Sequence, residues 1–299
     1  MKCRMCGQQG EVKLTRHNII LCREDFFSFI KRQVRKGIYK TEMLTRNDKI
    51  MVAVSGGKDS LVCWLLLEEL GYTTFGLHID LGIGEFSEKS REKVEKFATE
   101  RGFKYEILDI KRVVGFGIDE LGRGRRVCSL CGLVKRYWLN RYAWEKGFTA
   151  VATGHNLDDE AGALLGNLLH WQVEYISRQY PVLPSISPKL IKRVKPLYRL
   201  EENEIKLYAD LQGIDYINFT CPMRRGATGP VYKSALALIE KNSPGTRHNF
   251  LFQFLEEYRY YFKKERRLEL KECNNCGMPT TEEVCSYCKF IFRERKNAV

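Results

Sequence analysis

The 299-residue sequence has no uninterrupted apolar run of the roughly 18 residues that a helix needs to span a membrane. Its first six residues, MKCRMC, also lack the apolar segment of a secretory signal peptide. These two absences predict a soluble cytoplasmic protein without a membrane partner.

Acidic residues are the minority among the charged side chains, with 37 Asp and Glu against 50 Lys and Arg, so that the formal net charge is +13. A surplus of this size favours a polyanionic partner, and the 12% of aromatic residues would allow stacking on nucleobases. Many basic proteins bind nothing anionic, so composition alone only favours nucleic acid. The 44% of hydrophobic residues suffices for a sizeable core, which excludes global disorder.

A disulfide framework is not expected either, because the eleven cysteines are an odd number in a chain without a secretion signal. Most of them lie near the two ends, and four CxxC pairs occur along the chain. In a cytosolic protein, such pairs indicate metal or redox chemistry.

The C-terminal cysteines form two CxxC pairs separated by eight residues. A CxxC turn lets two thiolates converge at about 2.3 Å from one Zn²⁺, and the second turn completes a tetrahedron. Four sulfur ligands leave no open position, so the ion would be structural and would drive the folding of this short segment. The expected ligands are Cys273, Cys276, Cys285 and Cys288. Four ordinary thiols are the alternative, which this spacing disfavours.

The N-terminal cysteines predict a second zinc site that lacks one thiolate. Cys3 and Cys6 form its first pair, and Cys22 follows a hydrophobic segment. A second pair would place its other ligand three residues after Cys22, where Asp25 stands. A carboxylate oxygen is an accepted zinc ligand, so the spacing favours Asp25, with His17 as the other candidate.

Between these ends, apolar runs of strand length alternate with helical segments. We expect strands at residues 49–54, 73–80, 104–110 and 149–153. We expect helices at residues 61–71 and 87–101, and Cys63 within the first of them is interpreted as a core residue. The alternation predicts an α/β fold with a Rossmann-like parallel sheet and helices on both faces. A basic and aromatic helix around residues 251–270 is expected to connect this sheet to the C-terminal zinc module.

The first expected strand leads into SGGKDS, residues 55–60, and then directly into a helix. Gly56 and Gly57 would let backbone N–H groups approach phosphate oxygens at the positive end of that helix, and Lys58 adds a mobile positive charge. The Walker glycine motif and the GxGxxG motif are both absent. The loop instead resembles the pyrophosphate loop of ATP pyrophosphatases, which adenylate a carbonyl oxygen and release pyrophosphate. An ordinary glycine turn is the alternative.

A second loop, GHNLDDE at residues 154–160, follows the fourth expected strand and opens a helix. It would lie at the carboxyl end of the sheet, where open α/β folds bind ligands. Asp158 and Asp159 are candidates to hold Mg²⁺ together with a triphosphate, because Mg²⁺ prefers a few carboxylates plus phosphate oxygens. Capping of the helix N-terminus is the alternative role, and it is expected for at least one of the two.

Three cysteines in the middle of the chain are further candidates for chemistry. Cys128 and Cys131 can point their sulfurs together in a first helical turn, and Cys221 lies ninety residues further on. Three converging thiolates suggest an iron–sulfur cluster in which one iron lacks a protein thiolate and can hold an exchangeable sulfur. A cluster-free relay, in which Cys128 or Cys131 and Cys221 cycle through persulfide and disulfide, stays open. Lowered thiol pKa values are expected from the helix N-terminus and from Arg123, Arg125 and Arg126.

In combination, SGGKDS, CSLCGLVKR, GHNLDDEA, a distant CPMR and the terminal zinc pairs resemble the tRNA 2-thiouridine synthetase family. More narrowly, they are similar to its two-zinc-finger group of T-loop and wobble-uridine thiolases, which implies a PP-loop ATP pyrophosphatase fold. The resemblance implies that a 4Fe-4S cluster binds Cys128, Cys131 and Cys221. The sequence departs from the family pattern at Asp25, where the family commonly has histidine.

The resemblance also implies a set of nucleotide contacts and catalytic residues. ATP is expected to contact Ala53, Val54, Ser55, Gly56, Gly57, Lys58, Ser60, Ile79, Lys135, Gly154 and Asp159. The expected catalytic residues are Lys58, Asp59, Asp159, Cys128 and Cys221.

The activity that the resemblance implies is ATP-dependent tRNA uridine 2-sulfurtransfer. ATP, with Mg²⁺ and Lys58, would adenylate the C2 oxygen of a flipped uridine, and sulfide held at the open iron would expel AMP. Asp59 would hold metal or loop geometry. A T-loop uridine is the favoured substrate. The alternatives are a wobble-uridine thiolase, a cytidine thiolase, an amidating ligase and a non-catalytic zinc-ribbon RNA-binding protein.

The expected cofactors are ATP, Mg²⁺, two Zn²⁺ and the 4Fe-4S cluster. The expected partners are tRNA and an external sulfur donor, for which the family suggests a ubiquitin-like thiocarboxylate protein, and a homodimer stays open. Four segments are expected, namely an N-terminal zinc module at residues 1–30, a PP-loop catalytic domain at 31–245, a connector helix at 246–270 and a zinc ribbon at 271–299.

Overall fold

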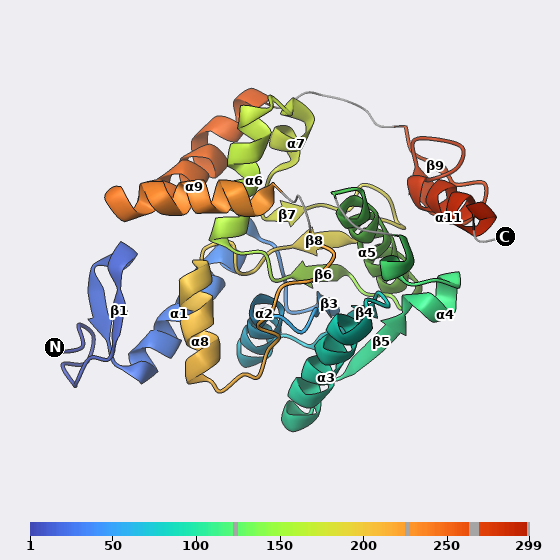
Figure 1. The fold of residues 1–299 in the computed structure, drawn as a ribbon. Helices are drawn as coiled ribbons and strands as arrows, with labels where there is room; N and C mark the ends of the chain where they lie inside the picture. Colours follow the sequence, from blue (N-terminus) through green and yellow to red (C-terminus); the bar gives the residue numbers. More distant parts are fainter. Residues whose placement is uncertain (122–124, 225–227, 263–268, 298–299) are drawn as a thin grey trace.

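The computed structural model describes residues 1–121, 125–224, 228–262 and 269–297. Its centre is a six-stranded sheet in the order β5-β4-β3-β6-β8-β7 (Figure 1). The strands are β3 (Ile50–Ala53), β4 (Thr74–Asp80), β5 (Tyr105–Asp109), β6 (Ala150–Thr153), β7 (Val182–Leu183) and β8 (Lys192–Val194). Within this sheet, β7 and β8 pair antiparallel and the other neighbouring strands pair parallel. The four expected strands are confirmed, and two unexpected short strands extend the parallel sheet into a mixed one.

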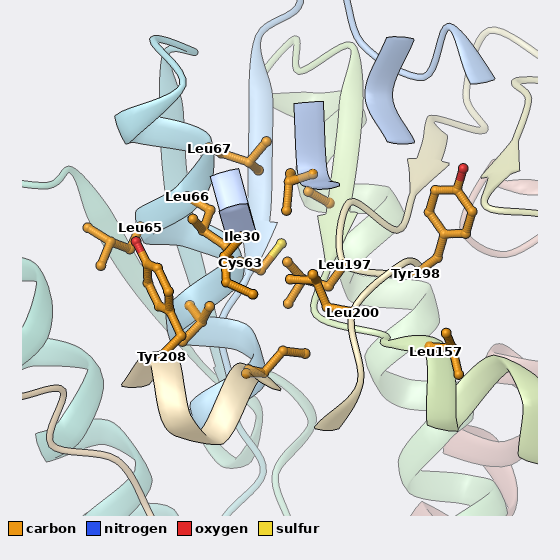
Figure 2. Close-up of a cluster of buried hydrophobic side chains, with 14 of the residues drawn as sticks. Ile30, Cys63, Leu65, Leu66, Leu67, Leu157, Leu197, Tyr198, Leu200 and Tyr208 are labelled. Carbon is orange, nitrogen blue, oxygen red and sulfur yellow. The ribbon is translucent and has the colours of Figure 1, made fainter. Parts of the chain in front are cut away.

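Both faces of the sheet are buried, and the side chains of its strands point alternately into two apolar cores. Ile50 and Val52 of β3 lie in the first core, whereas Met51 between them lies in the second. Helices that contribute to the first core include α1 (Arg23–Thr41), α2 (Lys58–Glu69), α3 (Gly84–Arg101) and α8 (Glu202–Leu211). Figure 2 shows part of it, with Cys63 and Leu66 of α2 near Ile30 of α1. Cys63 is therefore a core residue, as expected.

The second core lies on the opposite face of the sheet and reaches the C-terminal segment. It includes side chains of α4 (Ile110–Val114), η2 (Ile118–Leu121), α5 (Arg125–Glu145) and α11 (Ser286–Asn297). The strands β9 (Lys271–Glu272) and β10 (Pro279–Thr280) precede α11. At the other end of the chain, β1 (Val12–Leu14) and β2 (Ile19–Leu21) form a hairpin around η1 (Thr15–His17) before α1 begins. The two chain ends lie on opposite sides of the molecule (Figure 1).

Further helices gather beside the β7–β8 edge of the sheet (Figure 1). They are α6 (Leu157–Leu169), α7 (Val173–Arg178), α9 (Gly229–Asn242) and α10 (Thr246–Gln253), and α10 continues into a π-helical turn, η3 (Phe254–Tyr258), and a 3₁₀ turn, η4 (Arg259–Phe262). The helical segment expected around residues 251–270 thus begins at Thr246, the first residue given for the connector at 246–270, and residues 263–268 lie outside the described part of the chain. α10 packs against both α6 and α9, so its residues belong to this helical layer.

None of the helices in the described part of the chain combines the length and the apolar character that a membrane span requires.

Candidate functional site

The glycine loop joins the carboxyl end of β3 to the N-terminus of α2. Gly56 has a φ of +77°, and a Cβ there would lie 2.6 Å from the backbone oxygen of Ser90, so only glycine fits. The Ser60 hydroxyl accepts a hydrogen bond from the Ser55 N–H at 3.0 Å and donates one to the Gly57 carbonyl at 2.9 Å. These contacts hold the loop in a fixed turn whose N–H groups lie at the positive end of α2.

A cavity of about 250 Å³, called the loop cavity below, opens beside this turn between β3, β4, α3 and α5. Six of the expected nucleotide contacts line it, namely Ala53, Val54, Ser55, Gly57, Ile79 and Lys135. The sequence interpretation missed the apolar walls of the cavity, which include Leu81, Ile83 and Phe86. Leu81 and Ile83 could have been found, because they follow shortly after β4 and continue its apolar pattern. The cavity therefore combines apolar walls with a cationic side chain and a glycine turn.

His78 also lines the loop cavity and was not expected there. Its Nδ1 lies 2.9 Å from the Val54 carbonyl, which only accepts, so Nδ1 carries the proton. Burial lowers the pKa of His78 and keeps the ring neutral. Its buried Nε2 is then an acceptor without a hydrogen-bond partner among the described residues. A ligand with a donor group would satisfy it.

Charged side chains meet at the other end of the loop. Lys58 lies 3.0 Å from Asp59 and 2.9 Å from Glu202, and Glu202 lies 2.6 Å from Lys233. Lys233 in turn lies 2.9 Å from Asp159. The expected residues Lys58, Asp59 and Asp159 are thus brought together, through two residues that the sequence interpretation missed. We call these five residues the charged cluster.

The electrostatics of the charged cluster follow from this pairing. Burial opposes ionisation of Glu202, but hydrogen bonds from Lys233 and Lys58 outweigh it and hold its pKa at about 2. Burial raises the pKa of Asp59, with Asp159 adding to the shift and Lys58 opposing it. The cluster therefore keeps two ammonium groups and at least one carboxylate within reach of the loop.

The loop after β6 approaches α2 closely at Gly154, where a Cβ would lie 2.7 Å from the backbone of Asp59. Asn156 caps α6, because its side chain accepts from the Asp159 N–H at 3.0 Å while the Asp159 carboxylate accepts from the Asn156 N–H at 3.2 Å. Asn156 also donates to Asp59 at 3.0 Å. The capping role considered for Asp159 is therefore present, and its other oxygen faces Lys233.

Asp158 does not fit the magnesium role considered for it. Its carboxylate is buried, and one oxygen pairs with Arg247 of α10 while the other accepts from the Glu202 N–H at 2.8 Å. Arg247 also pairs with Glu201 at 3.1 Å. Protein groups thus occupy both oxygens of Asp158, which joins α6 to α8 and α10.

Cys128 and Cys131 lie along one face of α5, which begins at Arg125. Cys128, Cys131, Lys135 and Leu139 follow the three- and four-residue spacing of a helix face, and the last two line the loop cavity. At about 1.5 Å per residue, Cys131 is about 6 Å from Lys135 along the helix axis. Cys221 belongs to the same neighbourhood, because its charge and that of Cys128 both act on Cys131. The Cys128 thiol lies 3.7 Å from the Met223 carbonyl.

The expected lowering of thiol pKa values is wrong for Cys131. Burial raises its pKa, Cys221 and Cys128 add to this, and Lys135 opposes it. Arg123 and the side chains of Arg125 and Arg126 lie outside the described residues, as does Arg225.

The N-terminal ligand candidates converge. One ligand atom from each of Cys3, Cys6, Cys22 and Asp25 lies within 4.8 Å of every other. The Cys6 and Cys22 sulfurs are 3.7 Å apart, which matches the edge of about 3.8 Å expected for a tetrahedron with Zn–S bonds of about 2.3 Å. His17 instead lies 3.1 Å from Glu204. Of the two candidates for the fourth ligand, the geometry favours Asp25.

The C-terminal candidates converge in the same way. The sulfurs of all four cysteines lie within 4.8 Å of one another, and those of Cys276 and Cys285 are 3.8 Å apart. The module docks on α5 through the ring of Tyr287, which stacks on Tyr137 with centroids 3.6 Å apart and accepts a hydrogen bond from Trp138 at 2.9 Å. Both terminal groups have the donor set and spacing that suit a tetrahedral ion.

Comparison with known proteins agrees with this geometry. Residues 28–220 match a family model described as a PP-loop domain. The chain is 46% identical to the tRNA-5-methyluridine(54) 2-sulfurtransferase of Thermus thermophilus, over 99% of this chain and 94% of that protein. It is 43% identical to the protein of the same name from Pyrococcus horikoshii, over 97% of this chain and 93% of that protein.

A solved structure with a similar fold is the U34-tRNA thiolase NcsA from Methanococcus maripaludis with its 4Fe-4S cluster. The two folds superpose with a TM-score of 0.83, at 29% sequence identity, over 98% of this chain and 96% of that chain.

Proposed function

The chain belongs to the PP-loop family of tRNA 2-sulfurtransferases, and on this premise we propose that it replaces the C2 oxygen of a tRNA uridine by sulfur at the expense of ATP. The observation that carries the proposal is the single face of α5, which presents Cys128 and Cys131 beside Lys135 and the loop cavity. A sulfur-handling group and an ATP-binding group are thus neighbours on one rigid element.

In the proposed ATP site, the base and ribose occupy the loop cavity and the triphosphate follows the glycine turn to the charged cluster. The apolar walls suit a purine, and the acceptor Nε2 of His78 would satisfy the exocyclic amine of adenine. Lys58 and Lys233 supply the positive charge that the phosphates need. Mg²⁺ is proposed to bind Asp59 or Asp159 together with the phosphates, since Asp158 is occupied by Arg247.

The proposed reaction has two steps, adenylation of the uridine and displacement of AMP by sulfide. The C2 oxygen of the uridine attacks the α-phosphorus of ATP, and pyrophosphate leaves with its electron pair, favoured by the two lysines. Sulfide then attacks C2, the C2–O bond breaks, and AMP leaves with the original oxygen. Asn156 orients Asp59 through its hydrogen bond, which fixes the loop against the bound phosphates.

Cys128, Cys131 and Cys221 are proposed to hold a 4Fe-4S cluster. Three thiolates rather than four would leave one iron open, and there the cluster would supply a position for exchangeable sulfide. A persulfide relay on the same cysteines is the second candidate, since a relay needs only two thiols.

The two terminal groups are proposed to bind one structural Zn²⁺ each. Closed four-ligand sets are typical of structural ions, and the sulfur–sulfur distances of 3.7 and 3.8 Å support this assignment. The proposed segments remain the zinc modules at 1–30 and 271–299 and a catalytic domain at 31–245, with residues 246–270 between them.

The proposed substrate is the T-loop uridine at position 54. The two relatives named for position 54 share 46% and 43% identity with this chain, whereas NcsA, named for U34, shares 29%. The family resemblance suggests a separate ubiquitin-like thiocarboxylate protein as sulfur donor. A cytoplasmic location is a further proposal, and a homodimer stays open.

Nucleoside mass spectrometry tests the proposal directly. Unmodified tRNA incubated anaerobically with the reconstituted protein, ATP, Mg²⁺ and sulfide should gain one 2-thiouridine at position 54, with one AMP released for each. Thiolation at position 34 would favour a wobble thiolase, and thiolation of cytidine a cytidine thiolase. ATP turnover without any thionucleoside would contradict the proposal.

A further inference from the structure

Trp171 occupies an unusual backbone position directly after α6. Its φ is +48°, in the left-handed region that bulky side chains rarely adopt. The Gln172 N–H bonds to the Asn167 carbonyl at 2.9 Å and the Trp171 N–H to the Leu168 carbonyl at 3.1 Å. This is the Schellman pattern, in which the residue at Trp171 is usually glycine. A tryptophan here costs conformational free energy that glycine would not cost.

Folding does not offset this cost by burying the side chain. Trp171 is 74% exposed, and its indole makes no ring contact with the described residues. Tyr175, one turn into α7, is 66% exposed as well. Strained residues without a structural reward are candidates for contact with a ligand.

A groove of about 530 Å³ with both polar and apolar walls lies between α6 and α9, next to the turn that holds Trp171, and we call it the α6–α9 groove. Its lining includes both sequence neighbours of Trp171, namely His170 and Gln172. His170 forms a hydrogen bond of 2.8 Å with Tyr232 of α9, which ties the end of α6 to the opposite wall. Gly166 allows α6 and Tyr232 to approach closely, since a Cβ at this position would lie 2.7 Å from the Tyr232 ring.

The α6–α9 groove runs from His170 and Gln172, the neighbours of Trp171, to the proposed reaction site. Asp159 and Lys233 line the groove and also belong to the charged cluster. Arg224, three residues after Cys221, is exposed and lines the groove as well. The groove thus joins the turn that holds Trp171 to a guanidinium and to residues beside the proposed ATP site.

We infer that the α6–α9 groove binds an unpaired nucleotide of the tRNA close to the reacting uridine, with its base stacked on Trp171 and its phosphate paired with Arg224. The inference rests on the proposed function, which makes tRNA the substrate. A base presents a flat π-face to an exposed indole, and a phosphate matches the fork of a guanidinium. The chain's net charge of +13 suits the same polyanion.

The variant Trp171→Gly separates this role from a structural one. Glycine adopts the left-handed turn freely, so the variant should fold with a thermal midpoint equal to or above that of the wild type. Its dissociation constant for an unmodified tRNA transcript, measured by fluorescence anisotropy at fixed salt, should rise by about fivefold to 100-fold. Its ATP affinity should be unchanged, because Trp171 lies outside the loop cavity.

Two further variants complete the design. Trp171→Phe keeps an aromatic face and should retain most of the tRNA affinity. Arg224→Gln removes one phosphate contact and should reduce the slope of log affinity against log salt by about 0.7 to 0.9.

The outcomes distinguish this inference from the proposed function. If Trp171→Gly binds and thiolates tRNA as the wild type does, the inference is wrong and the proposed function stands. If Trp171→Gly instead converts a dimer to a monomer while its tRNA dissociation constant stays the same, Trp171 serves contacts between copies, and the inference is again wrong. If the wild-type protein neither binds nor thiolates tRNA, the proposed function fails and the inference fails with it.

Discussion

Removal of one partner from the ion pair between Arg247 and Asp158 should be one of the most destabilising single changes in the helical layer, because it leaves a buried charge without its partner. The two side chains are only 9% and 8% exposed, and Arg247 also pairs with Glu201. Arg247→Met would fill a similar volume but leave the Asp158 carboxylate buried without its cation. Removal of one partner of a buried pair typically costs about 3–5 kcal/mol. We therefore expect a loss of this size in the free energy of unfolding.

The expected loss in the free energy of unfolding corresponds to a fall in the melting temperature. An unfolding entropy of about 2.1 cal/mol/K per residue gives about 0.6 kcal/mol/K for this chain, so the midpoint should fall by about 5–8 °C at pH 7. Calorimetry measures both quantities. As a control, Lys206→Met removes an exposed pair with Asp210 and should leave the midpoint unchanged.

The deficit should depend on pH in a defined direction. Burial already raises the pKa of Asp158, and Arg247 opposes that shift. Without Arg247 the folded-state pKa rises further above the unfolded value, so the ionised carboxylate destabilises the fold fully only above the raised pKa. The deficit should shrink as pH falls from 7 towards 4, and Asp158→Asn in the Arg247→Met background should recover much of it at pH 7. The reasoning would be refuted if Arg247→Met lowered the free energy of unfolding by less than about 1 kcal/mol. It would also be refuted if the loss did not change with pH and was not reduced by Asp158→Asn.

Three further predictions concern the proposed site. Cys276→Ser should lower the metal content by about one zinc per chain, measured by mass spectrometry of the metal, whereas Cys63→Ala in the core should not; unchanged zinc in the first variant would remove the assignment. Lys58→Ala and Asp59→Ala should stay folded by circular dichroism yet release AMP about 100-fold more slowly or worse, since they remove charge at the triphosphate and not core packing; release at the wild-type rate would contradict the role of the loop. Anaerobic reconstitution should add about four irons per chain, and single Cys→Ala changes at Cys128, Cys131 and Cys221 should each abolish the visible band and thiolation together; fully active protein with zinc but no iron would favour the persulfide relay.

The sequence predicted those parts of the site that lie next to one another in the chain. The apolar run before SGGKDS, with its two glycines, was enough to predict β3, the turn and α2. Glu202 and Lys233 could not be found in this way, because they lie 144 and 175 residues after Lys58 and resemble ordinary solvated helix residues. Only the fold brings them to the loop.

Asp158 and the short strands β7 and β8 show two other reasons why the structure differs from the sequence predictions. Adjacent acidic residues at a helix start suggested one shared role, but successive helix positions point about 100° apart, so Asp158 meets Arg247 while Asp159 faces Lys233. The strands β7 and β8 contain two and three residues, too few for an alternating pattern to be recognised. They exist because β6 offers an open edge, which is a tertiary cause.

The shared face of α5 makes the chemistry sensitive to insertions rather than to substitutions. One residue inserted between Cys131 and Lys135 would rotate the cysteines by about 100° relative to the loop cavity, whereas an exchange of an outward-facing side chain would leave their alignment intact. Seven inserted residues would restore the alignment but move the thiols about 10 Å further from the cavity. The distance between Cys131 and the proposed nucleotide site is therefore set by the pitch of one helix, and no adjustment of side chains elsewhere can replace it.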